Sequence, residues 1–364
     1  MGSVYSFSLY RNALEGRYNI NRVVSGLPYM ASLFFYALSM LVSGRTLNPV
    51  NFKRFVMVGG GLFVAAWVVA ALSSNIVVFI LGYGLFMGWA VGMLYGAALS
   101  FIQWYARGRH GFLSGVMLLG FGLSSVVLAP VAQHILAQRS LTVLFFIYGG
   151  AAFSVFVPLM AWLPSHEATV VVQSKIKTPS VLLKTIIFFL ATMVGLTIIG
   201  ITGTMGIELY GFEPRQVALM ISFFALCNAL SRPIFGIFMD RWGFKVSAII
   251  SLVLMVLATV ISGVNQGNHL FGFILGYGLY WFNLGAWLSI MPTYIKQSLG
   301  KEQYAQAYGK VFIGYGLAAM AGTFMAGVLL EWFSQTLYIY LLMGIMIVLM
   351  AFFVRVEIKA VKQH

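Results

Sequence analysis

The chain has 364 residues, of which 61% are hydrophobic and only 8% are charged, and its mean hydropathy is +0.93. Soluble domains usually carry about 25% charged residues, so this composition excludes a soluble globular protein. The formal net charge is +14, but the cations are spread thinly over short intervals and are not clustered with aromatic residues, which excludes a nucleic-acid-binding face. The single cysteine, Cys227, excludes an intrachain disulfide.

Apolar runs long enough to cross a bilayer, about 17 to 25 residues each, recur along the whole chain. They lack the alternation of a strand, and inside lipid the backbone of such a run is paired internally only as a helix. The sequence therefore predicts an all-α polytopic membrane protein with eleven complete spans. In chain order these spans are 23–44, 55–73, 77–101, 111–136, 141–163, 185–207, 217–240, 246–264, 270–293, 305–329 and 336–354.

Two sequence patterns recur 194 positions apart, which indicates a duplicated unit of about half the chain. The hexapeptide ILGYGL occupies 80–85 and 274–279, and a set of glycines recurs at the same offset: Gly115, Gly120 and Gly122, then Gly309, Gly314 and Gly316. We predict two parallel six-helix bundles, 1–163 and 185–364, joined by a cytoplasmic linker at 164–184. The repeat places Met1 inside the first helix, so we expect residues 1–10 to be the outer end of that helix, which is then incomplete through either a truncated chain or a misassigned start.

The distribution of Lys and Arg predicts the orientation in the membrane. Fifteen of them fall in intervals on one side of the predicted spans and five on the other, namely Arg11, Arg17, Arg22, Arg139 and Arg215. By the positive-inside rule the first side is cytoplasmic. We therefore expect an integral protein of a bacterial cytoplasmic membrane, in contact with the lipid bilayer, with both termini cytoplasmic once the first helix is complete.

A charged motif follows the predicted span 217–240. Residues 236–245 read GIFMDRWGFK, with Gly236, Asp240, Arg241, Gly243 and Lys245 as its key members. A carboxylate and a cation at a helix end can interact with neighbouring helix termini in one conformation and separate in another. In the first half, residues 44–53 keep Gly44 and the final lysine, but Asn48 replaces the acid. We predict that these residues form a gate with an ionic latch on one half only.

This motif resembles the signature loop of the major facilitator superfamily. Within it, the chain resembles the oxalate:formate antiporters and the monocarboxylate transporters. The stretches that carry the resemblance are 5–8 (YSFS), Trp104 with 107–109 (RGR), 111–115 and 228–236 (NALSRPIFG). The resemblance implies the major facilitator fold, transport by alternating access, and an arginine before a proline, Arg232, that contacts the substrate carboxylate.

The position of Arg232 supports this role without the resemblance. It lies eight residues before Asp240, so a helix places it about 12 Å from that helix end, near the bilayer middle. An arginine there costs about 2.5 to 3.5 kcal/mol, and its helical neighbours, Asn228 among them, supply no carboxylate. A planar guanidinium suits a carboxylate ligand. The alternative is an arginine held by backbone carbonyls between helices.

Other polar residues refine the predicted substrate. All eight acids fall in loops or near helix ends, and Asn228 stands where the related monocarboxylate transporters have an aspartate, which disfavours proton symport and favours anion exchange or facilitated diffusion. Glu208 is the residual proton candidate. Lys310 is a candidate second cation site, but a snorkelling interfacial lysine is the competing interpretation, and Tyr315 occupies the place of a second anchor lysine in the oxalate transporter. We therefore expect a monocarboxylate such as formate, pyruvate or lactate.

Hydroxyl groups are the remaining candidate ligands. We expect that some of five tyrosines line the substrate site: Tyr5, Tyr29, Tyr95, Tyr280 and Tyr315. The five histidines show no ligand spacing, so we predict no metal site, and nothing in the sequence predicts a cofactor. No catalytic constellation is present, so an enzyme is not expected, and we expect a monomer. A carrier of a neutral solute or drug, and a membrane sensor that does not transport, remain alternative functions.

Overall fold

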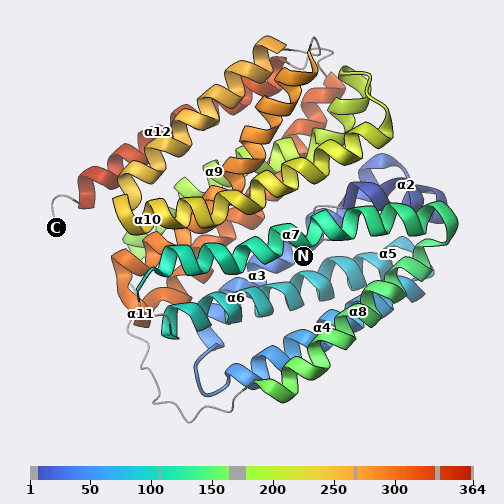
Figure 1. Ribbon diagram of the computed structural model, residues 1–364, viewed down its shortest axis with the longest axis horizontal. Coiled ribbons are helices and arrows are strands. Elements are labelled where there is room, and N and C mark those ends of the chain that lie inside the picture. The colour runs from blue at the N-terminus through green and yellow to red at the C-terminus, as the bar shows by residue number, and fades with distance from the viewer. Residues whose placement is uncertain (1–6, 106–107, 164–177, 266–268, 333–336, 362–364) are drawn as a thin grey trace.

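The computed structural model describes residues 7–105, 108–163, 178–265, 269–332 and 337–361, and every regular element within them is helical. The elements are α2 (Phe7–Tyr18), α3 (Arg22–Thr46), α4 (Phe52–Leu72), α5 (Ile76–Phe79), η1 (Ile80–Phe86), α6 (Met87–Tyr105), α7 (His110–Gln138), α8 (Leu141–Trp162), α9 (Thr178–Thr204), η2 (Met205–Leu209), α10 (Pro214–Asn265), α11 (Leu270–Trp332) and α12 (Leu337–Val361). Figure 1 shows them as two bundles, one coloured blue to green and the other yellow to red.

The predicted spans are present in the described residues. Nine helices there are long and apolar enough to cross a membrane, and two of them, α10 and α11, each hold two spans. Each is interrupted by one glycine in the left-handed region, Gly243 at φ 70° and Gly300 at φ 78°, where a side chain would be strained. The eleven predicted spans and the all-α fold are therefore confirmed.

Local capping explains several helix starts. Asn21, Asn75 and Ser140 are the N-caps of α3, α5 and α8, and their side chains accept hydrogen bonds from the backbone N–H groups of Val24, Val78 and Val143. Each satisfies one of the donors that a helix start leaves unpaired. These caps turn the chain from one span into the next at the same end of the bundle.

Two predicted boundaries are wrong. The first helix does not end near Tyr10, because α2 continues to Tyr18 and includes Arg17, which donates hydrogen bonds to the carbonyl oxygen of Ser73 at 2.8 Å and the hydroxyl of Thr142 at 3.1 Å. The linker is also shorter than 164–184, because α9 begins at Thr178.

The two copies of ILGYGL adopt different backbones. The first copy is the π-helix η1, whereas the second lies in regular α-helix within α11. In η1, Gly82 lies against the backbone of Ala70, and a Cβ there would be 2.9 Å from the Ala70 nitrogen. Short π segments are uncommon, so this is a local departure from the symmetry of the repeat.

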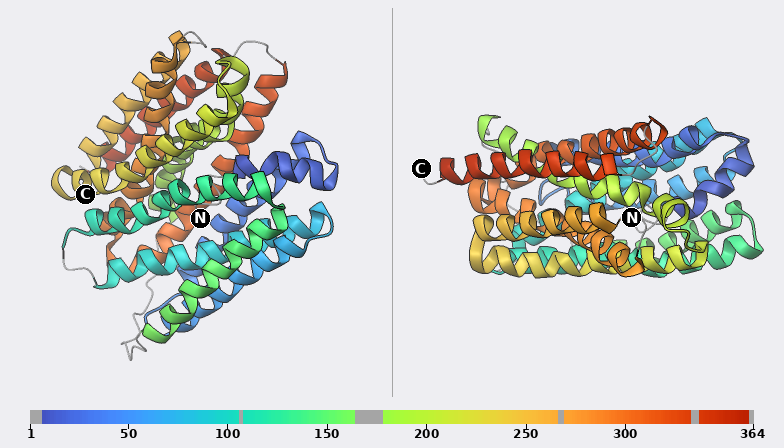
Figure 2. Two further views of the ribbon diagram at one scale, coloured as in Figure 1. Left: turned by 45° about the vertical axis from the view of Figure 1, so that its right-hand side comes forward. Right: turned by 90° about the horizontal axis from the view of Figure 1, so that it is seen from above.

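The two bundles meet along two helix crossings that are equivalent under the repeat (Figures 1 and 2). In the α7–α10 seam, a Cβ on Gly115 would lie 2.5 Å from the Arg232 carbonyl oxygen, and one on Gly122 would lie 2.6 Å from the Ala229 Cβ. Small residues allow two helices to approach this closely. The duplicated glycines therefore set the contact between the halves.

The α3–α11 seam repeats these contacts. A Cβ on Gly309 would lie 2.5 Å from the Met40 carbonyl oxygen, and one on Gly316 would lie 2.5 Å from the Ala37 Cβ. Both seams run toward the end of the bundle that carries the predicted cytoplasmic intervals, including Arg45, Arg109 and Lys301, which we call the basic end. At the left of Figure 1, helices of the two bundles lie against each other at this end.

Candidate functional site

Arg232 is fully buried in the α7–α10 seam, with 0% exposure. Its guanidinium donates to the carbonyl oxygen of Leu118 on the opposite half and, at 2.9 Å, to the side-chain oxygen of Asn228 on its own helix. The face of the Phe121 ring lies 4.9 Å from the guanidinium carbon, within the range of a cation–π contact. These described partners are neutral and come from both halves.

The Asn228 side chain holds the guanidinium in a fixed direction. Asn228 is fully buried, and its amide nitrogen donates to the Trp281 carbonyl oxygen at 2.8 Å. The Trp281 indole in turn donates to the Thr202 hydroxyl at 3.1 Å. The amide orientation is thereby set, so its oxygen faces Arg232. An amide cannot titrate, and this network offers no proton-carrying group at that position.

Two of the predicted tyrosines join the same region. We define the central aromatic cluster as Tyr36, Tyr95, Phe121, Phe312 and Tyr315, which come from α3, α6, α7 and α11. The Tyr95 ring lies 5.8 Å from the Phe121 ring, and the Tyr36 ring lies 5.9 Å from the Tyr315 ring. Phe121 therefore connects Arg232 to hydroxyl-bearing rings of both halves.

The other predicted tyrosines lie elsewhere. Tyr280 is buried and donates its hydroxyl to Thr259 at 2.8 Å, so it stays inside the second bundle. The Tyr29 ring packs 5.6 Å from the Phe7 ring in the first bundle. Tyr5 lies outside the described residues. The spacing of these residues did not distinguish the ones that approach Arg232, because every helix carries several aromatic residues.

Asp240 connects the two halves at the basic end. Its carboxylate oxygens accept hydrogen bonds from the backbone N–H groups of Gly111 and Phe112, both at 2.9 Å. These N–H groups belong to the first turn of α7, where a helix favours negative charge. Gly236 lies directly against Gly111, and Gly243 supplies the left-handed turn that follows. Arg241 and Lys245 are exposed.

Within the described parts of the chain, the equivalent position of the first half makes no such bond across its seam. Asn48 and Asn51 bond to each other, each side chain accepting from the other's backbone N–H at 2.9 Å. Gly44 still lies against the Ala305 carbonyl, the contact equivalent to that of Gly236 with Gly111. The close packing is therefore duplicated, whereas a carboxylate cap is present at the α7–α10 seam.

The remaining charged candidates are less buried than Arg232. Glu208 is exposed in η2, and Lys310 is half-buried on α11. A buried ion pair that the sequence did not reveal joins Lys184 to Glu357 at 2.6 Å, and the Tyr294 hydroxyl donates to the same carboxylate oxygen at 2.6 Å. These residues are 173 positions apart in the sequence, so helix spacing gives no signal for the pair.

Cavities lie in the α3–α11 seam and at the end of the molecule opposite the basic end. A cavity of about 10 Å³ lies in the α3–α11 seam, and a larger one of about 440 Å³ lies where α2, α7 and α8 end away from the basic end, with Arg17 and Arg139 in its lining. Among the described residues, no group of three or more His, Cys, Asp or Glu side chains could hold a metal ion.

Comparison with known proteins identifies the family. The model of the Major Facilitator Superfamily matches residues 1–210 and 185–363, so both halves of the repeat are covered. The chain belongs to the Major Facilitator Superfamily. It is a membrane transporter of this superfamily rather than an enzyme, and the predicted fold and family are confirmed.

Individual members of the superfamily resemble this transporter at low identity. The uncharacterized MFS-type transporter YhjX of Escherichia coli (strain K12) is 24% identical over 341 residues, 88% of this chain and 82% of that protein. The oxalate:formate antiporter of Oxalobacter formigenes is 22% identical over 338 residues, 88% of this chain and 79% of that protein. The proton:xylose symporter XylE matches in structure with a TM-score of 0.79 at 13% identity, over 97% of this chain and 92% of that one.

Proposed function

We propose that this superfamily member carries a small monocarboxylate across the membrane by alternating access, and that Arg232 binds the carboxylate. The observation that carries the proposal is a fully buried guanidinium at the seam between the halves whose described partners are neutral. A planar fork of N–H donors matches the two oxygens of a carboxylate. The similarity to the oxalate:formate antiporter supports the same substrate class.

The hydrogen bond from Arg232 to the Leu118 carbonyl oxygen links substrate binding to movement of the two halves. It crosses the seam, so movement of one half against the other breaks it. A buried charged donor that loses its partner costs about 1 to 3 kcal/mol or more. A bound carboxylate replaces the carbonyl and removes that cost, which favours movement of the loaded carrier over movement of the empty one. Such a preference is the basis of exchange.

The small number of buried cations supports the transport of one carboxylate group per cycle. Among the described residues, the buried cations are Arg232 and Lys184, and Lys184 is paired with Glu357. Lys310 is only half-buried, and Tyr315 belongs to the central aromatic cluster. The single positive charge of Arg232 neutralises a monocarboxylate. A dicarboxylate would keep one uncompensated negative charge in the buried site.

The same residues favour anion exchange or facilitated diffusion over proton symport. The buried acid among the described residues is Glu357, which is paired with Lys184, while Asn228 cannot titrate. Glu208 is exposed and therefore lacks the burial expected of an intramembrane proton site. We place the basic end in the cytoplasm of a bacterial cell and propose a monomer in its cytoplasmic membrane. In this orientation the closed seams face the cytoplasm, and the cavity lined by Arg17 and Arg139 faces outward, where positive charge attracts anions.

A carrier of a neutral solute is the second candidate function. The central aromatic cluster favours it, because ring faces and hydroxyl groups also bind uncharged ligands. A neutral solute leaves the bonds from Arg232 to Leu118 and Asn228 in place. The two candidates therefore differ in their dependence on the guanidinium.

Uptake by purified protein in liposomes tests the proposal. Labelled formate, pyruvate, lactate and oxalate are offered while internal anion and pH gradient are varied separately. We expect uptake of a monocarboxylate that internal anion stimulates and that Arg232→Ala abolishes, with Arg215→Ala as the control for an exposed arginine of the same helix. Transport of a neutral solute that Arg232→Ala leaves intact contradicts the proposal.

A further inference from the structure

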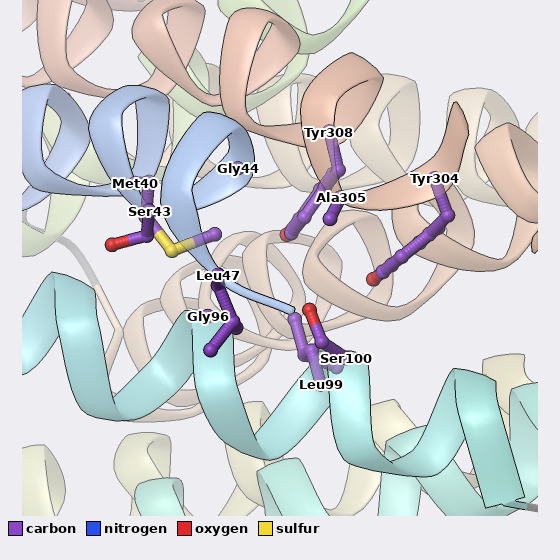
Figure 3. A pocket seen from close by; sticks show the side chains of 10 residues that line it. All are labelled: Met40, Ser43, Gly44, Leu47, Gly96, Leu99, Ser100, Tyr304, Ala305 and Tyr308. Carbon is purple, nitrogen blue, oxygen red and sulfur yellow. The ribbon is translucent and has the colours of Figure 1, made fainter. Parts of the chain in front are cut away.

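A small cavity in the α3–α11 seam has hydroxyl groups turned toward it (Figure 3). Its volume is about 10 Å³, which is at the lower limit for holding one water molecule. Figure 3 shows the Tyr304 and Tyr308 hydroxyls of α11 running the same way toward α6 of the other half, and the Ser100 hydroxyl of α6 pointing back toward them. The site thus spans the boundary between the two bundles.

The Tyr304 hydroxyl is the observation that calls for a ligand. Tyr304 is 1% exposed, and its hydroxyl has no hydrogen-bond partner in the part of the chain that the structure describes. A buried hydroxyl left in this state is costly, so such groups are nearly always satisfied by protein or by ordered water. The neighbouring Tyr308 hydroxyl reaches Tyr95 at 3.4 Å, which is long for this type of bond.

The position of the cavity is explained by the repeat. Its lining includes Gly44 and Ala305, which are equivalent to Gly236 and Gly111 in the other seam. In that seam the Asp240 carboxylate bonds across the two halves. In the α3–α11 seam, Asn48 bonds within its own loop instead. Among the described residues, the cavity therefore lies in the seam where no carboxylate bonds across the halves at this point.

We propose that one ordered water molecule occupies this cavity and joins the halves through Tyr304, Tyr308 and Ser100. Three hydroxyl partners from two bundles are the number that a buried water usually has. The water is then the counterpart of the Asp240 cap and holds the second seam closed by a neutral bridge. This inference rests on the alternating access of the proposed function but is independent of the substrate.

Removal of the Tyr304 hydroxyl shifts the closed-to-open ratio in opposite directions for a hydrated and for a dry cavity. If water bridges the seam, Tyr304→Phe removes a bond that exists in the closed state, and the closed-to-open ratio falls by about 2- to 10-fold. If the cavity is dry, the same change removes an unsatisfied buried group, and the ratio rises instead. Ser100→Ala is the second variant, and we expect it to lower the ratio while adding little to Tyr304→Phe, because both changes lose the same water.

Spin labels at Arg54→Cys and Lys359→Cys, in a Cys227→Ser background, report the ratio as a distance distribution across the basic end. Both positions are exposed and lie outside the seams. Tyr340→Phe, which removes a buried hydroxyl bonded to Tyr277 within one bundle, is the control that should leave the distances unchanged. A rise in the closed population, or no change, for Tyr304→Phe overturns the proposal. The distances are read without substrate, so failure of the transport assay does not affect this result.

Discussion

The Asp240 cap is the contact between the halves whose loss can be predicted most directly. Its carboxylate accepts two hydrogen bonds of 2.9 Å from the first turn of α7, on the opposite half. Asp240→Asn keeps one acceptor oxygen and loses the charge that the helix start favours. Bonds to a charged group contribute about 1.5 to 3 kcal/mol when desolvated, but Asp240 is exposed and solvent screens it.

We therefore expect Asp240→Asn to destabilise the closed basic end by about 1 to 2 kcal/mol, which changes the closed-to-open ratio by about 5- to 30-fold. The spin-label pair at Arg54 and Lys359 measures this ratio. Asn48→Ala is the matched control at the equivalent position, where the side chain bonds to Asn51 and not to the other half. Unchanged distances in Asp240→Asn, or an equal shift in Asn48→Ala, would refute the reasoning.

Three further outcomes are expected. Gly115→Ala should open the basic end, because its Cβ would lie 2.5 Å from the Arg232 carbonyl oxygen, whereas Gly120→Ala, with no atom within 4 Å, should not; the same distance measurement compares them. Glu357→Ala should lower the melting temperature, since a buried charge that loses its partner costs about 3 to 5 kcal/mol, and adding Lys184→Met should restore much of the loss. Arg17→Gln should raise KM for the anion at low ionic strength without changing the maximal rate, whereas Arg215→Gln, an exposed arginine outside the cavity, should have a smaller effect.

The spans could be predicted because a bilayer dictates the length of an apolar helix. The way in which the spans end and connect could not be predicted in the same way. Gly243 and Gly300 join spans with a single left-handed residue, where the sequence predicted short loops. From the sequence, Lys184 is expected to be a solvated residue of the linker. Its ion pair with Glu357 could not be predicted, because it depends on two helices that are distant in the chain. The repeat also predicted part of the contact between the halves, since two of the glycine pairs that it duplicates, Gly115 with Gly309 and Gly122 with Gly316, lie in the two seams.

The candidate site was predictable in part for the same reason. Helix geometry places Asn228 one turn from Arg232, and the two side chains do bond. The alternative of a backbone carbonyl between helices was foreseen and is present in the Leu118 bond, but the sequence could not say which carbonyl, because no side chain marks a backbone acceptor. The choice among tyrosines also required the structure, since Tyr95 lies beside Phe121 while Tyr280 is bonded inside its own bundle. The role of Arg232 in binding a carboxylate stays a prediction.

Competition between a carboxylate and its neutral amide tests that role most directly. In liposomes loaded with unlabelled lactate, uptake of labelled lactate is measured with external lactate or lactamide as competitor, for the unaltered chain and for Arg232→Gln. The account predicts that lactate competes and lactamide does not, by a factor of at least about 10, since one charged hydrogen bond contributes about 1.5 to 3 kcal/mol. It predicts that Arg232→Gln loses exchange. Equal competition by lactamide, or exchange that survives in Arg232→Gln, would contradict the claim that Arg232 binds the substrate carboxylate.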